Sequence, residues 1–432
     1  MAKLEDYCLN ITDGEHGSVV DDNNGEYYLL SNKNMIDGEI VITSNDRKIS
    51  EENFRKINKR TKLSVSDVLI STVGTIGKIA MVDGNVNYDF QRSVGILKCN
   101  THTLLPKFLY YYLNSPYIQN KLIKTSKGAI QKCLFINDLK NLEVSIPPIP
   151  LQKKISNTLA LIDNKIKLNN KINAELENMA KTLYDYWFVQ FDFPDENKRP
   201  YKSANGKMVY NEVLKREIPD GWEVGTFSSY IHQDKGGDWG KDTLVGNYTK
   251  KVTCIRGADF PSLQGYSCCN APIRYILNKN SSKILSTGDL VVEISGGSPI
   301  QSTGRIGYVN QHTLARFDND IITSNFCKAL SLNNKNALYN FYLEWERLYK
   351  SGVFFNYEGK TTGIKNLLFD TFVESYKIVI PPQNIVDTFY ANVSNMFEKI
   401  QRNAKENHYL ELIRDFLLPL LMNGQVTVST ER

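Results

Sequence analysis

The chain has 432 residues, a length typical of two or three domains. Its Lys and Arg residues outnumber its Asp and Glu residues by five, so a nucleic-acid partner would have to meet locally rather than globally positive surface. No apolar run approaches the roughly 18 residues that span a membrane, and residues 1–5 lack the apolar core of a targeting signal. The seven cysteines form no CxxC pair and the five histidines are scattered, which predicts reduced thiols, no metal site and a cytoplasmic location.

Residues 1–145 predict a first globular domain of mixed α/β class. Ser50 is followed by two acidic residues, which is typical of a helix start. The other predicted strands and helices are short and separated by polar turns. In chain order, the predicted strands lie at 25–30, 39–43, 66–71 and 74–82, and a helix lies at 108–123.

The most regular stretch of the chain runs from Pro147 to Phe188 and has no proline or glycine after Pro150. Its apolar residues recur at alternating spacings of four and three, which is the pattern of a coiled-coil seam. Two polar residues, Asn169 and Asn173, occupy seam positions near the middle of this helix. The apolar members of the seam are Ile155, Leu159, Ile162, Ile166, Leu176, Ala180, Leu183 and Trp187.

The same pattern returns at Pro381, after a gapless offset of 381 − 147 = 234 residues, so that Asn403 and Asn407 match Asn169 and Asn173. We expect the two helices, each roughly 50 Å long, to pair antiparallel with their asparagines face to face. A buried seam asparagine fixes the register, because slippage would leave its amide in an apolar layer. The prediction is a pseudo-twofold arrangement; the alternative is two independent surface helices whose asparagines face solvent.

The remaining parts of the chain complete a repeat. Residues 191–221, rich in proline, glycine and charge, predict a connector with one hairpin-like segment. Residues 222–378 repeat the layout of the first domain and predict a second one. The two predicted spacer helices then occupy 146–190 and 379–425.

The two globular domains repeat less tightly than the helices. The offset between them is 222 residues at Asp67 and Asp289, and 230 at Gly77 and Gly307. By this alignment the second domain carries 230 − 222 = 8 extra residues around Ser295. A tight helical repeat with a loose domain repeat is typical of a scaffold that presents two different versions of one fold.

Both helix ends carry more apolar residues than one seam needs. We expect part of this surplus to be core and part to meet a partner helix that completes a bundle. The candidate docking residues are Tyr184, Trp187, Phe188, Phe416, Leu418 and Leu420.

Catalytic motifs are weak or misplaced. Residues 114–117 resemble the (D/N)PPY motif of amino-methyltransferases, but they lie inside a helical pattern and follow no strand. Residues 194–198 contain the letters of a PD…(D/E)xK nuclease, whose carboxylates must come from separated strands to meet Mg²⁺. No phosphate-binding loop and no nucleophile with an adjacent base is present. We therefore predict no catalytic residue.

Binding remains, and both domains carry loops that mix Gly, Thr, Lys or Arg, Asn or Gln and aromatic residues. Arg and Lys can pair with guanine, Asn and Gln with adenine, and backbone N–H groups with phosphate. Each such loop alone is ordinarily just a turn. The candidate DNA-binding residues are Thr75, Lys78, Gln91, Arg92, Lys127, Gln131 and Lys132 in the first domain, and Lys235, Trp239, Lys241, Thr303, Arg305, Lys360, Thr361 and Lys365 in the second.

Taken together, the helices, connector and loops resemble the specificity subunit of type I restriction–modification enzymes over essentially the whole chain. The most specific segments are the two Ile-Pro-Pro-then-helix repeats and connector residues 191–194, 200–203, 206–209 and 216–225. Residues 74–78 and 138–142 also follow the family pattern. One departure is Val386, which stands where the first helix has Gln152.

The resemblance implies two target recognition domains whose spacing is set by the helices, and which each recognise one half of a bipartite, asymmetric double-stranded DNA target. It further implies that two methyltransferase subunits dock on the helices and that translocase–nuclease subunits complete the enzyme. S-adenosylmethionine, ATP and Mg²⁺ would then belong to those partners, with no cofactor in this chain.

Two other function classes remain open at this point. A self-contained DNA methyltransferase or nuclease would act without partners. A coiled-coil adaptor that binds only protein would show no sequence preference for DNA.

Overall fold

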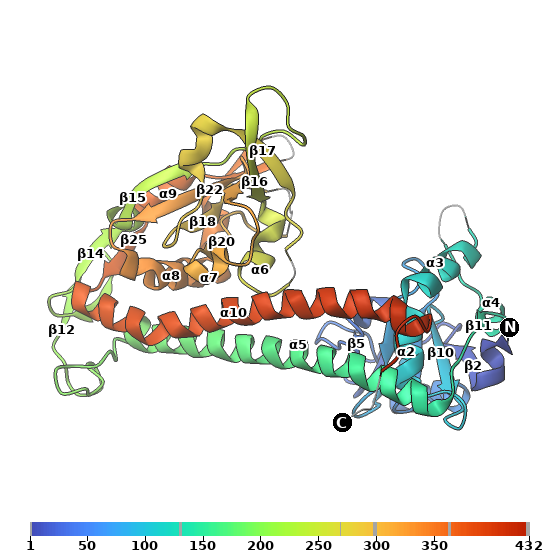
Figure 1. Ribbon diagram of the computed structural model, residues 1–432. Helices are drawn as coiled ribbons and strands as arrows, with labels where there is room; N and C mark the ends of the chain where they lie inside the picture. Colours follow the sequence, from blue (N-terminus) through green and yellow to red (C-terminus); the bar gives the residue numbers. More distant parts are fainter. Residues whose placement is uncertain (1, 129–131, 268, 297–299, 362–363, 429–432) are drawn as a thin grey trace. The chain divides into compact units, whose positions relative to one another are not determined.

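The computed structural model describes residues 2–128, 132–267, 269–296, 300–361 and 364–428, except for the side chains of Lys360 and Thr361. The chain divides into two compact units (Figure 1). Unit 1 comprises Met1–Asn164 with Leu410–Arg432, and unit 2 comprises Lys165–Tyr409. Each unit therefore contains one globular domain and a stretch of each long helix.

Unit 1 is built from short strands and helices in the mixed α/β order expected. Its strands are β1 (Ala2–Lys3), β2 (Cys8–Asp13), β3 (Tyr27–Leu30), β4 (Met35–Ile36), β5 (Glu39–Ile40), β6 (Lys48–Ile49), β7 (Val68–Ser71), β8 (Ile79–Met81), β9 (Tyr88–Phe90), β10 (Val94–Cys99) and β11 (Glu143–Val144). Its helices are η1 (Leu4–Tyr7), η2 (Asn32–Asn34), α1 (Glu51–Thr61), α2 (Pro106–Asn114), α3 (Pro116–Thr125), α4 (Ile136–Lys140) and the start of α5 (Ile149–Tyr184).

Local chemistry explains the helix boundaries in unit 1. The Ser50 hydroxyl accepts a hydrogen bond from the backbone N–H of Asn53 and so starts α1. The helix predicted over 108–123 is interrupted at Ser115, because Pro116 disfavours helical backbone at the residue before it and begins α3. The motif at 114–117 is thus a break between two helices.

The centre of unit 1 is a four-stranded antiparallel sheet in the order β2-β10-β7-β8, beside a three-stranded sheet β6-β3-β9 in which β3 and β9 are parallel. Strand β7 is buried along its whole length. Helix α2 packs with the first sheet, and its residues join a core that includes Leu159 of α5 and Leu418 of α10.

Unit 2 contains the connector, the second domain and most of both long helices. Its strands are β12 (Met208–Asn211), β13 (Arg216–Pro219), β14 (Glu223–Thr226), β15 (Ile231–Gly236), β16 (Tyr248–Ile255), β17 (Ile273–Leu277), β18 (Leu290–Glu293), β19 (Ser295–Gly296), β20 (Ile306–Tyr308), β21 (Ile321–Thr323), β22 (Cys327–Leu332), β23 (Glu358–Thr361), β24 (Ile364–Leu367) and β25 (Lys377–Ile380). Its helices are η3 (Asp185–Val189), which continues α5, η4 (Phe227–Tyr230), η5 (Gly257–Asp259), α6 (Phe260–Leu263), η6 (Asn278–Lys283), α7 (Gln311–Leu314), η7 (Lys335–Ala337), α8 (Leu338–Lys350), η8 (Val353–Tyr357), α9 (Phe369–Ser375) and α10 (Gln383–Met422).

The sheets of unit 2 repeat those of unit 1. The four-stranded sheet has the order β15-β22-β18-β20, and the three-stranded sheet β17-β16-β21 again has one parallel pair, β16 with β21. Strand β14 pairs with β25 as β1 pairs with β11. The predicted repeat of the fold is therefore confirmed, and unit 2 differs by the additional sheet β19-β24-β23.

The strand register corrects the alignment of the two domains. Val68 and Leu290 occupy equivalent positions, yet they pair with Met81 and Tyr308 respectively. Gly77 therefore corresponds to Gly304, not to Gly307 as the sequence suggested. The offset grows from 222 to 304 − 77 = 227, so the second domain has five extra residues here rather than eight.

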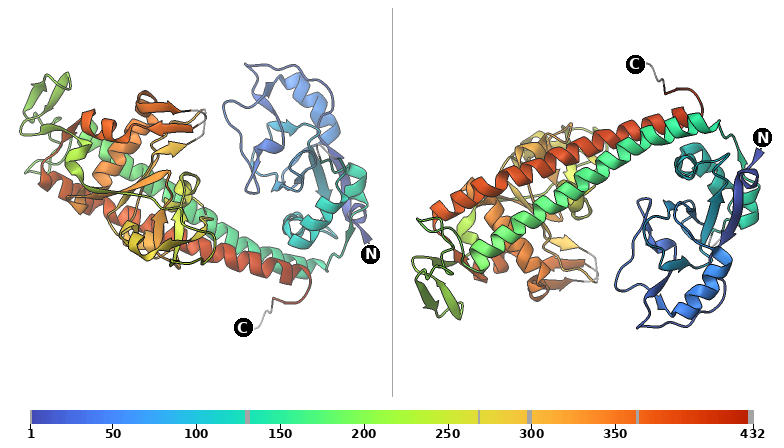
Figure 2. Two further views of the ribbon diagram at one scale, coloured as in Figure 1. Left: turned by 90° about the horizontal axis from the view of Figure 1, so that it is seen from above. Right: turned by 90° about the horizontal axis from the view of Figure 1, so that it is seen from below.

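Helices α5 and α10 run side by side and antiparallel in unit 2 (Figures 1 and 2), because residue numbers rise along α5 as they fall along α10. The rings of Trp187 and Phe389 lie 5.6 Å apart, centroid to centroid, and the Asn173 and Asn403 side chains are hydrogen-bonded. In unit 1 the helices also meet, through an ion pair of 3.2 Å between Asp163 and Arg414. The predicted coiled-coil seam is present.

Candidate nucleic-acid interface

The predicted DNA-binding loops of unit 1 lie at one edge of its four-stranded sheet. Strands β2 and β7 end at this edge, whereas β8 and β10 begin there, because neighbouring strands are antiparallel. Here the loop edge of unit 1 means residues 13–17, 71–78, 91–94 and 126–134 as far as they are described. Each globular unit thus brings separate parts of the sequence to a single edge.

Backbone hydrogen bonds join these loops to one another. The Gly74 N–H donates to the Lys132 carbonyl (3.1 Å), and the Leu134 N–H donates to the Thr72 carbonyl (2.8 Å). The Thr72 N–H in turn donates to the Ser93 carbonyl (2.9 Å). The loop edge is therefore a connected surface.

Most candidate residues of unit 1 are exposed on that surface. Lys78, Arg92 and Lys132 are exposed and have no ion-pair partner among the described residues, and Thr75 is also exposed. Gln91 is half-buried. Lys127 is exposed, with its Nζ 3.7 Å from an Asp138 carboxylate oxygen and above the Phe135 ring. Gln131 lies outside the described residues.

The equivalent loop edge of unit 2 comprises residues 236–242, 294–305, 323–327 and 357–366 as far as they are described. Its cations are mostly committed to acidic groups of the same unit. The Arg305 guanidinium donates two hydrogen bonds to Glu293, of 2.8 and 2.6 Å, and these bonds raise the pKa of Arg305. The Lys365 ammonium lies 3.1 Å from Glu358, which also accepts a hydrogen bond from the Thr303 N–H. The Glu293 and Glu358 carboxylates are themselves buried.

Lys235 belongs to the interior of its domain rather than to a DNA-binding surface. Its ammonium lies 3.1 Å from Asp289, whose side chain also accepts from the Ser286 N–H and the Ser331 hydroxyl. In unit 1 the equivalent Asp67 makes the same turn and pairs with Lys98. A buried acid with a lysine partner is thus a feature of the fold in both units, and Lys235 and Thr303, which is also buried, are corrected to structural residues.

Two candidates in unit 2 remain open to solvent. Trp239 is 37% exposed, with the Arg274 guanidinium 4.2 Å from its ring centroid. Lys241 is exposed and has its ammonium above the Tyr248 ring. The side chains of Lys360 and Thr361 lie outside the described residues.

The structure also reveals two residues that the sequence analysis missed. Cys327 donates its N–H to the Ser324 carbonyl, as Val94 donates to Gln91, so Asn325 stands where unit 1 has Arg92. Asn325 is exposed, and the neighbouring Phe326 is 53% exposed. Aligning the two turns that precede β10 and β22 would have found them, but those turns have no residue in common.

Comparison with known proteins places this arrangement. Residues 15–178 match the family model of the type I restriction modification DNA specificity domain. The chain is 26% identical to the MjaIX specificity subunit of a type I restriction enzyme from Methanocaldococcus jannaschii, over 94% of this chain and 88% of that protein. It is 24% identical to the HindI specificity subunit from Haemophilus influenzae, over 81% of this chain and 84% of that protein.

The chain belongs to the type I restriction–modification specificity subunits. Its fold is similar to the crystal structure of a type I restriction–modification S subunit from M. genitalium, with a TM-score of 0.58 and 16% identity over 100% of this chain and 96% of that one. The resemblance inferred from the connector and the repeated helices is thereby confirmed.

The specificity subunit's four seam asparagines form a polar layer between α5 and α10 in unit 2. Asn169 donates to Asn407 (2.9 Å) and Asn403 donates to Asn173 (2.8 Å), and all four side chains are buried. The Asn173 Nδ2 and Asn403 Oδ1 atoms have no partner in the described structure. A slipped register would leave still more buried amide groups without partners, which is costly.

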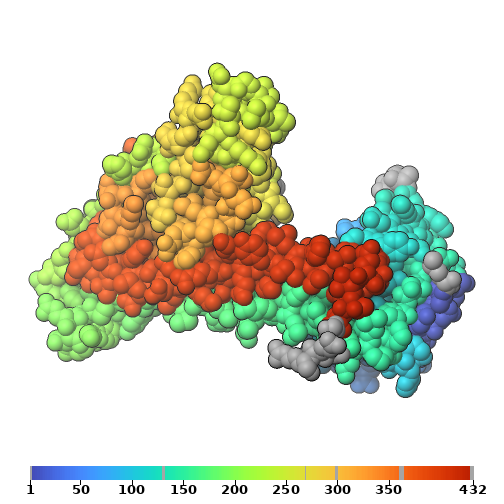
Figure 3. Space-filling model, in the orientation of Figure 1, coloured from blue at the N-terminus to red at the C-terminus, as the bar shows by residue number. Residues whose placement is uncertain are grey.

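The apolar surplus at the helix ends is only partly exposed. Tyr184, Trp187 and Phe188 are core residues of unit 2, so they are not free apolar surface. Leu418 is buried in unit 1 and Leu420 is half-buried, whereas Phe416 is 68% exposed. With Leu412 and Ile413, Phe416 forms an exposed apolar stripe on α10, whose outer side is visible in Figure 3.

Two classes of site were also sought in the described part of the chain. No three or more His, Cys, Asp or Glu side chains there are grouped to hold a metal ion. None of the helices there combines the length and apolarity needed to cross a membrane.

Proposed function

We propose that this protein is the non-catalytic DNA-specificity subunit of a type I restriction–modification complex, in which each unit recognises one half of a bipartite, asymmetric target. The observation that carries the proposal is the duplicated sheet whose loop edges have different side chains. One backbone design with two unlike sets of loop residues suits two different half-sites.

The residues at the two loop edges have the chemistry that this role requires. Lys78, Arg92 and Lys132 can meet phosphates or guanine, and Gln91 can pair with adenine. In unit 2, Asn325 and Lys241 offer the same functions, and Trp239 and Phe326 offer apolar surface to a thymine methyl or a sugar.

The helices would set the distance between half-sites and dock two methyltransferase subunits. Support for the first role is the asparagine layer, which gives α5 and α10 one register. Support for the second is the exposed stripe of Leu412, Ile413 and Phe416, since exposed apolar stripes mark interaction sites. Translocase–nuclease subunits would complete the complex, with S-adenosylmethionine, ATP and Mg²⁺ bound by the partners.

The decisive experiment is methylome sequencing of cells that carry this chain with its methyltransferase subunit. We expect one bipartite motif, and exchange of residues 1–145 for those of a relative should change one half only. A methylation pattern without sequence preference, or a change in both halves, would refute modular recognition.

The role of the helices has its own test. Inserting seven residues after Asn173, and seven at the facing position of α10, lengthens both helices by about 10 Å. We expect a longer spacer between the half-sites or no methylation. An unchanged spacer in an active complex would exclude the helices as the ruler.

A further inference from the structure

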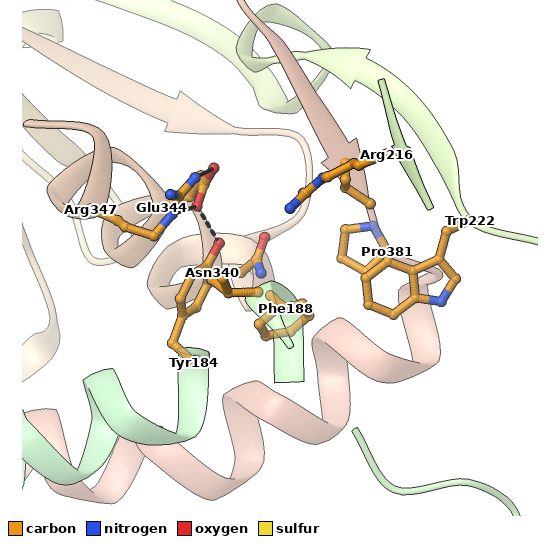
Figure 4. A pocket seen from close by; sticks show the side chains of 10 residues that line it. Tyr184, Phe188, Arg216, Trp222, Asn340, Glu344, Arg347 and Pro381 are labelled. Carbon is orange, nitrogen blue, oxygen red and sulfur yellow. Dashed lines mark hydrogen bonds and ion pairs between the residues drawn. The ribbon is translucent and has the colours of Figure 1, made fainter. Parts of the chain in front are cut away.

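A small pocket in unit 2 lies where the end of α5, the connector, α8 and β25 meet (Figure 4). Its empty volume, including the open mouth, is about 330 Å³. None of its lining residues belongs to the loop edge of unit 2. The lining residues that carry the argument are Tyr184, Phe188, Arg216, Trp222, Asn340 and Glu344.

Two hydrogen-bond donors in this pocket are uncommitted. Arg216 has no carboxylate partner among the described residues, and its guanidinium lies 5.2 Å from the centroid of the Phe191 ring. Asn340 is 5% exposed, and its Oδ1 accepts a hydrogen bond from the Tyr230 hydroxyl (3.4 Å). Its Nδ2 has no partner in the described structure. In Figure 4 the Arg216 guanidinium points toward Asn340 and Glu344.

The one carboxylate of the pocket is already neutralised. Glu344 accepts hydrogen bonds of 2.8 and 2.7 Å from Arg347, which raise the pKa of that guanidinium, and one of 2.9 Å from the Tyr184 hydroxyl. The positive charge of Arg216 is therefore uncompensated inside a pocket with aromatic walls. Such a site has donors to offer and favours an anion.

The surface around Arg216 indicates what kind of molecule carries the anion. Arg216 pairs with Asn211 across the β12–β13 hairpin, and alternation along the strand puts Val209 on the same face. Val209 is 42% exposed, and the neighbouring Tyr210 and Val213 are 55% and 61% exposed. A small polar pocket beside exposed apolar side chains is typical of a protein interface with one buried anchor.

We propose that this pocket accepts the carboxylate of an Asp or Glu side chain from the methyltransferase subunit, with Arg216 and Asn340 as the donors. The inference rests on the proposed function, because that function supplies the partner. It also gives Tyr184 and Phe188 a role in docking as pocket walls, not as exposed surface.

The test is the affinity of the full-length chain for the methyltransferase subunit encoded with it, measured by titration of labelled protein. We expect Arg216→Gln to weaken binding by about 10- to 100-fold, as for other truncated charge pairs at interfaces. Arg216→Glu should weaken it further through repulsion. Asn340→Asp keeps the acceptor for Tyr230 but replaces the donor with a charge, and it should also weaken binding.

The matched control is Lys215→Gln, which removes the neighbouring exposed cation and should leave affinity unchanged. Melting temperatures of all variants should match the wild type, which separates docking from folding. Wild-type affinity in Arg216→Gln, or an equal loss in Lys215→Gln, would overturn the pocket while leaving the proposed function intact. A wild-type chain that binds no methyltransferase subunit would overturn both.

Discussion

The two loop edges share a backbone but present their positive charge differently. Lys78 of unit 1 and Arg305 of unit 2 are equivalent, since each accepts a backbone hydrogen bond at the end of the neighbouring strand, from Ser71 and Glu293 respectively. Lys78 is exposed without an ion pair, whereas Arg305 is bound by Glu293.

The residue on the neighbouring strand makes this difference. The Ser71 hydroxyl donates to the Thr75 carbonyl and accepts from the Lys78 N–H, so it stabilises the turn without touching the lysine ammonium. Glu293 instead extends its carboxylate to the guanidinium. One fold can thus offer an unpaired cation in one unit and a fixed one in the other, which alters how each unit can approach DNA.

The largest expected effect is on the stability of unit 2. Glu293→Gln leaves Arg305 beside a buried neutral group, and we expect a loss of about 3 kcal/mol in the free energy of unfolding. Denaturant unfolding, followed by the fluorescence of the buried Trp345, measures it.

A double variant sharpens the comparison. Glu293→Ser with Arg305→Lys copies unit 1, and it should recover at least half of the lost stability because no buried charge remains unpaired. Recovery of none would show that the ion pair is not what distinguishes the two edges.

The next effect is on DNA affinity of the assembled complex. Lys78→Gln and Arg92→Gln should each weaken binding by up to about tenfold. Each should also reduce the slope of log affinity against log salt by about one for every phosphate that the variant no longer neutralises. Lys365→Gln is the control in unit 2, because its charge is already neutralised by Glu358. Equal slopes for all three variants would contradict the assignment of free and committed cations.

A third difference is a buried carboxyl present only in unit 1. Asp89 is fully buried, and burial raises its pKa although Thr61, Phe90 and Asn58 donate hydrogen bonds to it. The equivalent residue of unit 2 is Ile322, by the parallel pairing of β3 with β9 and of β16 with β21.

Because the pKa of Asp89 is higher in the folded than in the unfolded state, the folded state binds more protons, and stability should fall as pH rises from the unfolded pKa of about 3.9 through the folded value. Asp89→Asn should remove this pH dependence from unit 1. Hydrogen exchange of β9 as a function of pH measures it, with β21 as the internal reference.

The smallest effect concerns one backbone conformation. Ser66 has a positive φ of 76°, and Gly288 occupies the same turn in unit 2 with φ 95°. A left-handed conformation strains a residue with a Cβ atom but not glycine. Ser66→Gly should stabilise unit 1 by about 0.5 kcal/mol, and Gly288→Ser should destabilise unit 2 by about 1 kcal/mol, in thermal unfolding.

Sequence alone predicted the repeated mixed α/β domains, the connector hairpin and the paired helices. These features depend on local or periodic patterns. The spacing of apolar residues defines the seam of α5 and α10, and Asn169, Asn173, Asn403 and Asn407 define its register. The same four-three spacing could not show that Trp187 and Phe188 are core, because a seam residue and a docking residue look alike until the rest of the domain packs on them.

The alignment of the two loop edges and the state of their cations were decided only by the tertiary structure. Ser71 and Glu293 do not look alike, so only strand pairing shows that Gly77 matches Gly304. Glu358 lies 55 residues from Thr303 and Asp289 lies 54 residues from Lys235. A lysine or arginine in a loop is free or paired according to which distant acid the fold brings beside it, and that choice is made by three-dimensional packing rather than by local sequence.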